Sequence, residues 1–557
     1  MTANPPPDTE SQNNHKSHVH NGLVHSLSWL NISLTVEDRS TKQPKDLVAN
    51  VSGRVEAGEV LALMGPSGSG KTILLNVLAG RVSATKGSVL VNGARVSAPD
   101  YKKLTSFVEQ EDMLVGCLTV RETFDFAARL SLPRYTLKNE EGSRVQTLID
   151  SFGLKKQADT LIGTSIRKGI SGGQKRRVSV ASQLITTPSI LFLDEPTSGL
   201  DSVASLQVVS LLKTYAQKHK LIVVASIHQP SAATFQLFDK LLLLSQVQTC
   251  YFGSVSKASS YFSSLGLPVP NPMNLSEHIL DLTNTDYNSE HLEEQVSAQC
   301  LLDIQSAWRT HTEENHCEAS DFDTIASFAG SQRAGPAHDL DIPITLLHRL
   351  FIKSYRDIVT YWVRVTMYMG LAVMMGTVWL RLNPVQKDIQ SFVNALFFES
   401  AFLSFMAVAY VPAFLEDRAI FVKERANGLY GPLAFVVSNF LIGLPFPFLI
   451  SILFAGVTYG LVGFRSDATA IFIHVMWLFL DLVAAESLVV LVASLLPNFI
   501  VALAFVAFVN GLWMAVGGFL VPTVRLNVFW RYAFHYIDYQ SYVFQGMMVN
   551  EFTGRVY

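Results

Sequence analysis

Residues 59–79 read EVLALMGPSGSGKTILLNVLA, and this stretch decides the fold of the first half of the chain. Residues 59–64 are mostly apolar and predict a buried strand, while residues 73–79 predict a helix. Between them, residues 65–72 fit the pattern G-x-x-x-x-G-K-[ST], which requires a strand before it and a helix after it. The stretch therefore predicts an α/β domain that binds the phosphates of a nucleotide.

The loop itself supplies the groups that phosphates require. Its glycines let backbone N–H groups approach the phosphate oxygens, and the N-terminus of the following helix adds positive potential. Lys71 is expected to neutralise the β- and γ-phosphates, and Thr72 to hold Mg²⁺. The expected nucleotide-binding residues are Gly65, Pro66, Ser67, Gly68, Ser69, Gly70, Lys71 and Thr72.

A second apolar run, residues 190–193, ends in two carboxylates. Asp194 lies at the expected end of a strand and suits Mg²⁺, while Glu195 is placed to polarise an attacking water. Residues 221–227 predict another strand, which ends in His228. Because parallel strands end at one edge of a sheet, His228 is expected near the γ-phosphate. Gln110, which follows the apolar residues 105–108, is the remaining candidate for catalysis and for binding Mg²⁺.

Residues 171–174 read Ser-Gly-Gly-Gln and lie between the phosphate loop and the acidic strand end in the sequence. With these motifs in this order, the first half resembles the nucleotide-binding domain of an ABC ATPase. The resemblance implies that Gln110 is the Q-loop residue, residues 198–201 the D-loop and His228 the switch. It implies ATP and Mg²⁺ as cofactors and hydrolysis of ATP by positioning and charge neutralisation.

In that family two domains pair head to tail, and each ATP lies between one chain's phosphate loop and the other chain's signature. The resemblance therefore implies that Ser171, Gly172, Gly173 and Gln174 contact ATP bound by another subunit. The family also stacks adenine on an aromatic residue of an early strand. That position corresponds to Leu34 here, which leaves either an apolar contact alone or a contribution from Trp29.

The second half has a different composition, because apolar runs about 20 residues long, enough to cross a bilayer, recur in it. Before the first run, residues 346–361 mix basic and apolar side chains in a pattern typical of a helix at a membrane interface. The loop expected after the second run carries Arg418, Lys423 and Arg425, as the positive-inside tendency predicts for a cytosolic loop. Five spans are expected, at residues 359–380, 392–411, 433–459, 468–496 and 499–521.

Residues 421–430, FVKERANGLY, resemble the intracellular loop of G-subfamily ABC transporters, and an ATPase followed by a membrane domain is that subfamily's order. The resemblance implies a half-transporter that works as a homodimer or a heterodimer. It implies export of lipophilic small molecules or lipids, from a multi-pass protein in the plasma membrane or an internal membrane, with a cytosolic nucleotide-binding domain. The subfamily has an outer segment and a sixth span after residue 521, whereas this chain ends before a sixth span. A truncated gene model, a naturally short variant and a subunit that needs a fuller partner all stay open.

Ionisable residues inside expected spans are costly, so Glu399, His474, Asp481 and Glu486 are either functional or paired with one another. Two aromatic residues, Phe402 and Phe405, lie where the subfamily has substrate contacts, and residues 517–520 resemble its apolar gate. Packing is the competing interpretation for each of them.

The predicted fold class is an α/β P-loop ABC nucleotide-binding domain followed by an all-α transmembrane domain. The expected boundaries are a disordered tail at 1–24, the nucleotide-binding domain at 25–287, a linker at 288–340 and the membrane domain at 341–557. The formal net charge is −3, which does not indicate nucleic-acid binding and argues against an ABC ATPase of ribosomes or DNA. A transport-incompetent or regulatory subunit stays open as an alternative to a transporter.

Overall fold

The computed structural model describes residues 24–38, 42–132, 138–164, 167–284, 291–315 and 341–555. Nearly all of the expected N-terminal tail therefore lies outside the described residues. The chain divides into two compact units. The first contains Met1–Asp112, Tyr135–Asp159 and Ile170–Gly335, and the second contains Met113–Arg134, Thr160–Gly169 and Pro336–Tyr557.

The first unit contains a six-stranded sheet in the order β5-β6-β7-β3-β8-β9, in which β9 is antiparallel to β8 and the other neighbours are parallel. A second, antiparallel sheet has the order β2-β1-β4. The central strands β3, β6 and β7 are buried along their whole length, as expected of parallel strands covered on both faces. The strands are β1 (Ser26–Glu37), β2 (Pro44–Glu56), β3 (Val60–Met64), β4 (Lys86–Val91), β5 (Thr105–Val108), β6 (Ile190–Leu193), β7 (Ile222–Ser226), β8 (Lys240–Ser245) and β9 (Gln248–Ser254).

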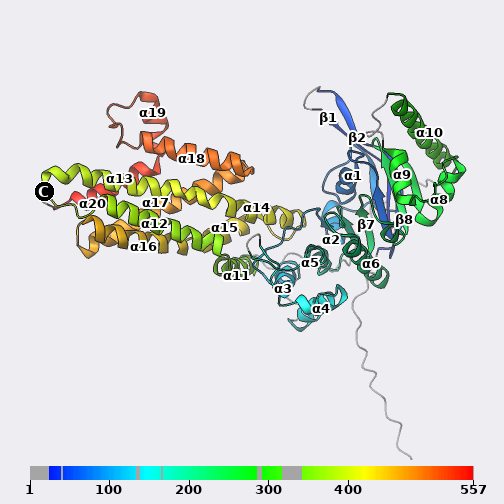
Figure 1. The fold of residues 1–557 in the computed structure, drawn as a ribbon, viewed down its shortest axis with the longest axis horizontal. Coiled ribbons are helices and arrows are strands. Elements are labelled where there is room, and N and C mark those ends of the chain that lie inside the picture. The colour runs from blue at the N-terminus through cyan, green and yellow to red at the C-terminus, as the bar shows by residue number, and fades with distance from the viewer. Residues whose placement is uncertain are drawn as a thin grey trace, which may run out of the picture. The chain divides into compact units, whose positions relative to one another are not determined.

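Helices pack around these sheets (Figure 1). The helices of the first unit are α1 (Lys71–Leu78), α2 (Ala98–Leu104), α4 (Lys138–Ser151), α5 (Gly172–Leu184), α6 (Ser202–His219), α7 (Ala232–Phe235), α8 (Val255–Ser264), α9 (Leu275–Thr283) and α10 (His291–Asn315). The strand–loop–helix context expected around residues 65–72 is present, because β3 ends at Met64 and α1 begins at Lys71.

The range 288–340 was expected to be a linker with some helix, and its first half forms α10. This helix packs against β9, with Leu301 and Ile304 buried and Gln305 Nε2 donating to Ser245 O at 3.1 Å. The segment is polar in overall composition, but its few buried apolar side chains attach α10 to the nucleotide-binding unit. Residues 316–340, the rest of the expected linker, lie outside the described residues.

The second unit is helical. Its helices are α3 (Val120–Ser131), α11 (Asp341–Arg356), α12 (Arg364–Val378), α13 (Ile389–Met406), α14 (Val411–Ala426), α15 (Pro432–Gly443), α16 (Pro445–Val462), α17 (Ala468–Leu495), α18 (Phe499–Val516), α19 (Val528–Ala533) and α20 (Tyr539–Phe552). Helix α3 lies within the range predicted for the nucleotide-binding domain, 25–287. By contacts it groups with this unit, because it packs on α11, where Arg356 and Glu122 form a salt bridge of 2.7 Å.

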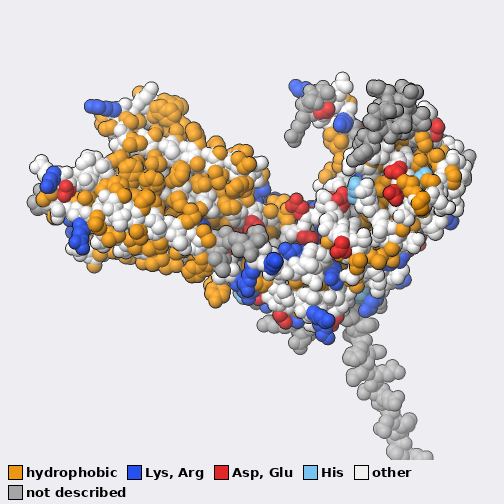
Figure 2. All heavy atoms as spheres, viewed as in Figure 1, with side chains coloured by type: hydrophobic (Ala, Val, Ile, Leu, Met, Phe, Trp, Pro, Cys, Tyr) orange, Lys and Arg blue, Asp and Glu red, His pale blue; other side chains and the backbone are white. Residues whose placement is uncertain are grey.

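Among the described residues, four helical stretches are long and apolar enough to cross a membrane. They are Gln386–Ala426, Pro432–Val462, Ala468–Leu495 and Phe499–Val516. A fifth is added if the bent pair Asp341–Arg356 and Tyr361–Val378 counts as one span. Figure 2 shows hydrophobic side chains over much of the visible surface of these helices, and Leu433, Phe472, Ile500 and Phe508 are among those exposed. An apolar outer surface of this kind suits a lipid environment.

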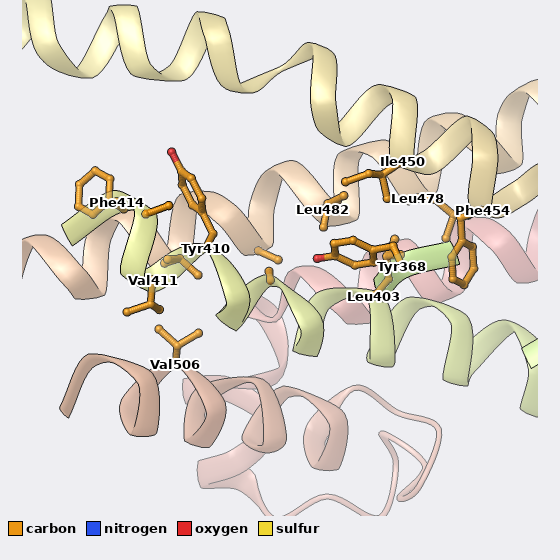
Figure 3. Close-up of a cluster of buried hydrophobic side chains, with 14 of the residues drawn as sticks. Tyr368, Leu403, Tyr410, Val411, Phe414, Ile450, Phe454, Leu478, Leu482 and Val506 are labelled. Carbon is orange, nitrogen blue, oxygen red and sulfur yellow. The ribbon is translucent and has the colours of Figure 1, made fainter. Parts of the chain in front are cut away.

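Inside the unit, apolar side chains from neighbouring helices form a continuous core (Figure 3). Tyr368 of α12, Leu403 of α13, Phe454 of α16 and Leu482 of α17 are buried together there. The helices of this unit therefore hold one another by packing.

The charged segment after the second expected span is helical rather than a loop up to Ala426. Its acidic side chains bind α11: Asp417 lies 2.6 Å from Lys353, and Glu424 lies 2.5 Å from Arg349. The Tyr430 hydroxyl also donates to Glu424 at 2.5 Å. Two basic residues of the amphipathic pattern at 346–361, Arg349 and Lys353, are therefore buried in ion pairs, which the pattern alone did not reveal.

Replacing Lys353 with methionine is expected to destabilise the second unit by about 3–5 kcal/mol, because the change leaves the carboxylate of Asp417 buried without its partner. The measurement is thermal unfolding of the detergent-purified protein. The double variant Lys353→Met, Asp417→Leu is the matched control, and we expect it to regain most of the stability. Equal unfolding temperatures for wild type and the single variant would contradict this assignment.

Candidate nucleotide-binding site

The sheet order brings the predicted motifs to one edge. Strands β5, β6, β7 and β3 are parallel neighbours, with Val108 paired to Leu193 and Leu193 paired to Ala225. Loops that follow the carboxyl ends of parallel strands lie side by side, and ligands of α/β sheets bind there. This edge carries the phosphate loop after β3, Gln110 after β5, Asp194 and Glu195 after β6, and His228 after β7.

The phosphate loop takes a shape that only glycine permits at two positions. Gly65 has φ 150° and Gly70 has φ 94°. A Cβ at Gly65 would lie 2.0 Å from Leu244 O, and one at Gly70 would lie 2.6 Å from Leu47 O. The loop therefore curves tightly, and α1 begins directly after it with its first N–H groups available to an anion.

Lys71 is folded back onto the loop. Its ammonium donates to Gly65 O at 2.8 Å and to Pro66 O at 2.7 Å, and 7% of the residue is exposed. Burial lowers the pKa of Lys71, although Glu195 and Asp194 oppose that shift. A phosphate in the loop would offer this buried cation a stronger acceptor than either carbonyl.

The acidic end of β6 is organised by a serine that the motifs did not identify. Ser226, the last residue of β7, donates to Asp194 Oδ1 at 2.7 Å and accepts the Glu195 N–H at 2.7 Å. Thr72 Oγ1 lies 3.2 Å from the same Asp194 oxygen. The hydroxyl of Thr72 and the carboxylate of Asp194 are the oxygen ligands that Mg²⁺ prefers, and Mg²⁺ completes its shell with water and phosphate. Sequence alone offered a weak signal for Ser226, its place at the end of the strand beside β6.

Glu195 is held in an unusual backbone conformation, with φ 43°. Left-handed φ values at residues other than glycine persist where surrounding contacts fix them, and they gather at functional sites. Its side chain accepts a hydrogen bond of 2.8 Å from Gln110 Nε2. Two of the predicted catalytic residues are therefore in contact, and the third, His228, is exposed directly after β7.

The Ser-Gly-Gly-Gln segment caps the N-terminus of α5. The Ser171 hydroxyl accepts the Gln174 N–H at 3.4 Å, and the Gln174 side chain accepts the Ser171 N–H at 2.9 Å. Ser171 and Gly172 are exposed. An exposed helix N-terminus with glycines in its first turn suits an anion such as phosphate.

Both residues considered for adenine binding, Trp29 and Leu34, are buried. Trp29 is fully buried, and its ring packs edge-on against Phe252 at 6.0 Å between centroids. A Trp29 contribution to adenine binding was therefore wrong, because the ring belongs to the core beneath the β1–β2 sheet. Leu34 is 8% exposed, which offers an adenine little surface as well.

Replacing Ser226 with alanine is expected to raise the Mg²⁺ concentration needed for half-maximal ATP hydrolysis by about 10-fold or more. Residues that orient a metal ligand typically have effects of about this size. The measurement is phosphate release as a function of Mg²⁺ concentration. Ser245→Ala is the matched control, because Ser245 ends β8 and its hydroxyl donates to Thr283 O at 2.7 Å. The same Mg²⁺ dependence in both variants would show that Ser226 does not orient Asp194.

The ionisable residues predicted inside the membrane spans all have polar partners. His474 Nε2 lies 3.2 Å from Glu399 Oε2, and Asp481 accepts a hydrogen bond of 2.8 Å from Ser404. Glu486 forms a salt bridge with Arg364, a partner that the sequence did not indicate. These contacts join α17 to α12 and α13, while a functional role for the same residues stays a prediction.

The residues considered for substrate contact and for the apolar gate include packed and exposed side chains. Phe402 stacks on Phe398 at 5.7 Å, and Phe519 of the expected gate stacks on Phe397 at 4.0 Å. Phe405 and Leu520 are exposed. A role for any of them in binding substrate or gating stays a prediction.

Both halves of the chain match known protein families. The family described as ABC transporter matches residues 48–198, and the family described as ABC-2 type transporter matches residues 344–552 and, in a further form, 228–311. ABC transporter G family member 1 of Petunia hybrida is 35% identical over 541 residues, covering 95% of this chain and 84% of that protein. ABC transporter G family member 11 of Arabidopsis thaliana is 35% identical over 553 residues, covering 95% of this chain and 78% of that protein.

The order of the two matched families is the order of the two units, and the relatives match across nearly the whole chain. The residues that fit the ATP motifs lie at one sheet edge, and the helical half carries candidate membrane spans. The chain belongs to the G family of ABC transporters, membrane proteins whose nucleotide-binding domain hydrolyses ATP to drive transport.

Proposed function

We propose that this chain is a half-transporter that pairs with a second half-transporter and exports lipophilic small molecules or lipids. A single observation carries the pairing. The chain has one phosphate loop, which follows β3, and one signature, which begins the helix α5 that packs against β5. Strands β5 and β3 are separated by β6 and β7, which sets them about 14 Å apart at a spacing of about 4.8 Å per strand.

Helix α5, which begins at the signature, packs against β5 and α6, whereas the phosphate loop follows β3. This arrangement favours an ATP that bridges two chains over an ATP held by one. The exposed N-terminus of α5 would then contact ATP in the phosphate loop of the partner. The homodimer and the heterodimer both satisfy this geometry.

The hydrolytic roles follow from the contacts at the sheet edge. Lys71 and the N–H groups of the loop would hold the phosphates, and Thr72 and Asp194 would hold Mg²⁺, which would supply neutralisation of the phosphate charge. Glu195 accepts a proton from the attacking water as general base. Gln110, whose amide lies 2.8 Å from the Glu195 carboxylate, orients that water and would be a further ligand of Mg²⁺. His228, exposed at the end of the neighbouring strand, donates to the γ-phosphate.

The large apolar side chains exposed on α15, α17 and α18 support insertion of the helical unit in a bilayer, where a lipophilic cargo is accessible to it. The nucleotide-binding domain faces the cytosol in this proposal, since ATP is supplied there. The protein is an integral membrane protein of the plasma membrane or an internal membrane.

The experiment uses inside-out vesicles that contain the full-length chain and a fluorescent lipid analogue as the probe. We expect accumulation of the probe that requires ATP and that is lost in vesicles carrying Glu195→Gln. Equal accumulation with wild type and Glu195→Gln would refute ATP-driven export. ATP hydrolysis without accumulation of any lipophilic probe would refute the proposed class of cargo while leaving the ATPase intact.

A further inference from the structure

Arg176 is a buried cation of the nucleotide-binding unit and has no role in the reaction described above. It lies on α5, two residues after the Ser-Gly-Gly-Gln segment, and 2% of it is exposed. A buried arginine needs several acceptors, because an unpaired charge is expensive to remove from water. The acceptors of Arg176 come from two loops that carry predicted catalytic residues.

The first loop follows β5. Arg176 Nη1 donates to Glu109 O at 2.7 Å, to Gln110 O at 3.1 Å and to Asp112 Oδ1 at 2.9 Å. Gln110 is the residue whose amide contacts the carboxylate of Glu195. The guanidinium thus fixes the backbone from which that amide projects.

The second loop follows β6. Arg176 Nη2 donates to Asp194 O at 2.8 Å and to Glu195 O at 3.1 Å, and its Nε donates to Pro196 O at 3.2 Å. These carbonyls belong to the turn in which Glu195 has φ 43°. A turn of that kind costs energy and persists only where contacts hold it, and Arg176 supplies three of them.

No other basic side chain could make this set of contacts. The guanidinium presents five N–H donors in a rigid planar fork, whereas the ammonium of lysine has three donors at a single atom. Five of the six acceptors are backbone carbonyls of the two loops. The Arg176 side chain therefore fixes the backbone of both loops at once.

We propose that Arg176 is a positioning residue for ATP hydrolysis, which holds the Gln110 loop and the Glu195 loop in register so that both side chains meet the attacking water. The proposal rests on the proposed roles of Gln110 and Glu195. It assigns Arg176 no contact with ATP, so the loss of its fork impairs turnover more than nucleotide binding.

The experiment compares Arg176→Lys with Arg177→Lys in the full-length, detergent-purified protein. Arg177 lies on the same helix but donates to Gly173 O at 3.4 Å and Phe152 O at 3.1 Å, away from both catalytic loops. For Arg176→Lys we expect kcat to fall about 10–100-fold, because a misplacement of about 1 Å can cost 10²-fold in rate. The KM for ATP should stay within about 3-fold, and Arg177→Lys should retain kcat within the same margin.

A second variant separates positioning from damage to the fold. Asp112→Ala removes one acceptor of Arg176, and we expect kcat to fall less than in Arg176→Lys. Because both changes act through the same contact, the double variant Arg176→Lys, Asp112→Ala should be no slower than Arg176→Lys alone. Stabilisation by MgATP in thermal unfolding confirms that each variant is folded. Wild-type kcat in Arg176→Lys, or equal losses in Arg176→Lys and Arg177→Lys, would overturn the proposal. If Glu195→Gln abolishes turnover while Arg176→Lys does not, this inference fails and the proposed function stands.

Discussion

Replacing Glu195 with glutamine is expected to lower ATP turnover by about 10²–10⁴-fold, the range over which a general base contributes to a reaction. The glutamine amide cannot take a proton from water. Its carbonyl oxygen can still accept the hydrogen bond that Gln110 Nε2 gives to Glu195 Oε2, so the geometry of the loop is preserved. Binding of ATP should therefore survive, and a dimer trapped with bound ATP should accumulate.

Two measurements test this expectation on the purified protein. Phosphate release reports turnover, and retention of a fluorescent ATP analogue reports binding. Glu195→Asp is the graded control, because it keeps a carboxylate that is one methylene too short, and we expect turnover between those of wild type and Glu195→Gln. Turnover within 2-fold of wild type in Glu195→Gln would show that Glu195 is not the general base. Each 10-fold change in turnover corresponds to about 1.4 kcal/mol of activation free energy.

Replacing Lys71 with alanine has the second largest expected effect, on the affinity for ATP. Hydrogen bonds to charged groups contribute about 1.5–3 kcal/mol, which corresponds to a loss of affinity of about 10- to 150-fold. The change also removes the cation nearest to two carboxylates, since Asp194 and Glu195 both act on the pKa of Lys71. Their charge would then repel the phosphates.

Equilibrium binding of a fluorescent ATP analogue measures this loss. Lys71→Met is the matched control, because it keeps the length and apolar stem of the buried side chain without its charge, and we expect the same loss of affinity. If Lys71→Met binds ATP as wild type does while Lys71→Ala does not, packing of the stem rather than charge holds the phosphate loop in shape.

The motifs were accessible to sequence analysis because each is short and lies at the end of an apolar strand. Once β3, β5, β6 and β7 are expected to be parallel, the loops that follow them must meet at one edge. Arg176 and Ser226 were not accessible in this way. Arg176 binds mostly backbone carbonyls, which carry no sequence signal, and Ser226 acts through a hydroxyl that looks like any other in a buried strand.

The burial and pairing of charged residues in the helical half were harder to predict from the sequence. The basic residues around Lys353 predicted an amphipathic helix at the membrane interface, and Asp417 lies in the charged segment that was expected to form a cytosolic loop. Each is buried against the other, and this pairing depends on how two helices far apart in the sequence cross. The error for Trp29 has a similar origin, since an aromatic residue of an early strand can face a ligand or the core, and periodicity does not distinguish the two faces.

The central claim is that each ATP site is built from two chains, and pairs of marked chains test it. The variants are Lys71→Ala, which disables the phosphate loop, and Gly172→Asp, which disables the signature. A Cβ at Gly172 would lie 3.8 Å from Leu200, an ordinary contact, so this substitution leaves room within its own chain. Two different affinity tags allow purification of mixed dimers only.

The decisive measurement is ATP hydrolysis by two such mixed dimers. A chain with Lys71→Ala paired with a chain with Gly172→Asp keeps one intact site if the sites are shared, whereas a doubly substituted chain paired with wild type keeps none. If the two sites hydrolyse ATP independently, the first dimer should have about half of wild-type turnover and the second almost none. The opposite result, with the second dimer active and the first inactive, would show that each chain holds a complete ATP site and would contradict the account.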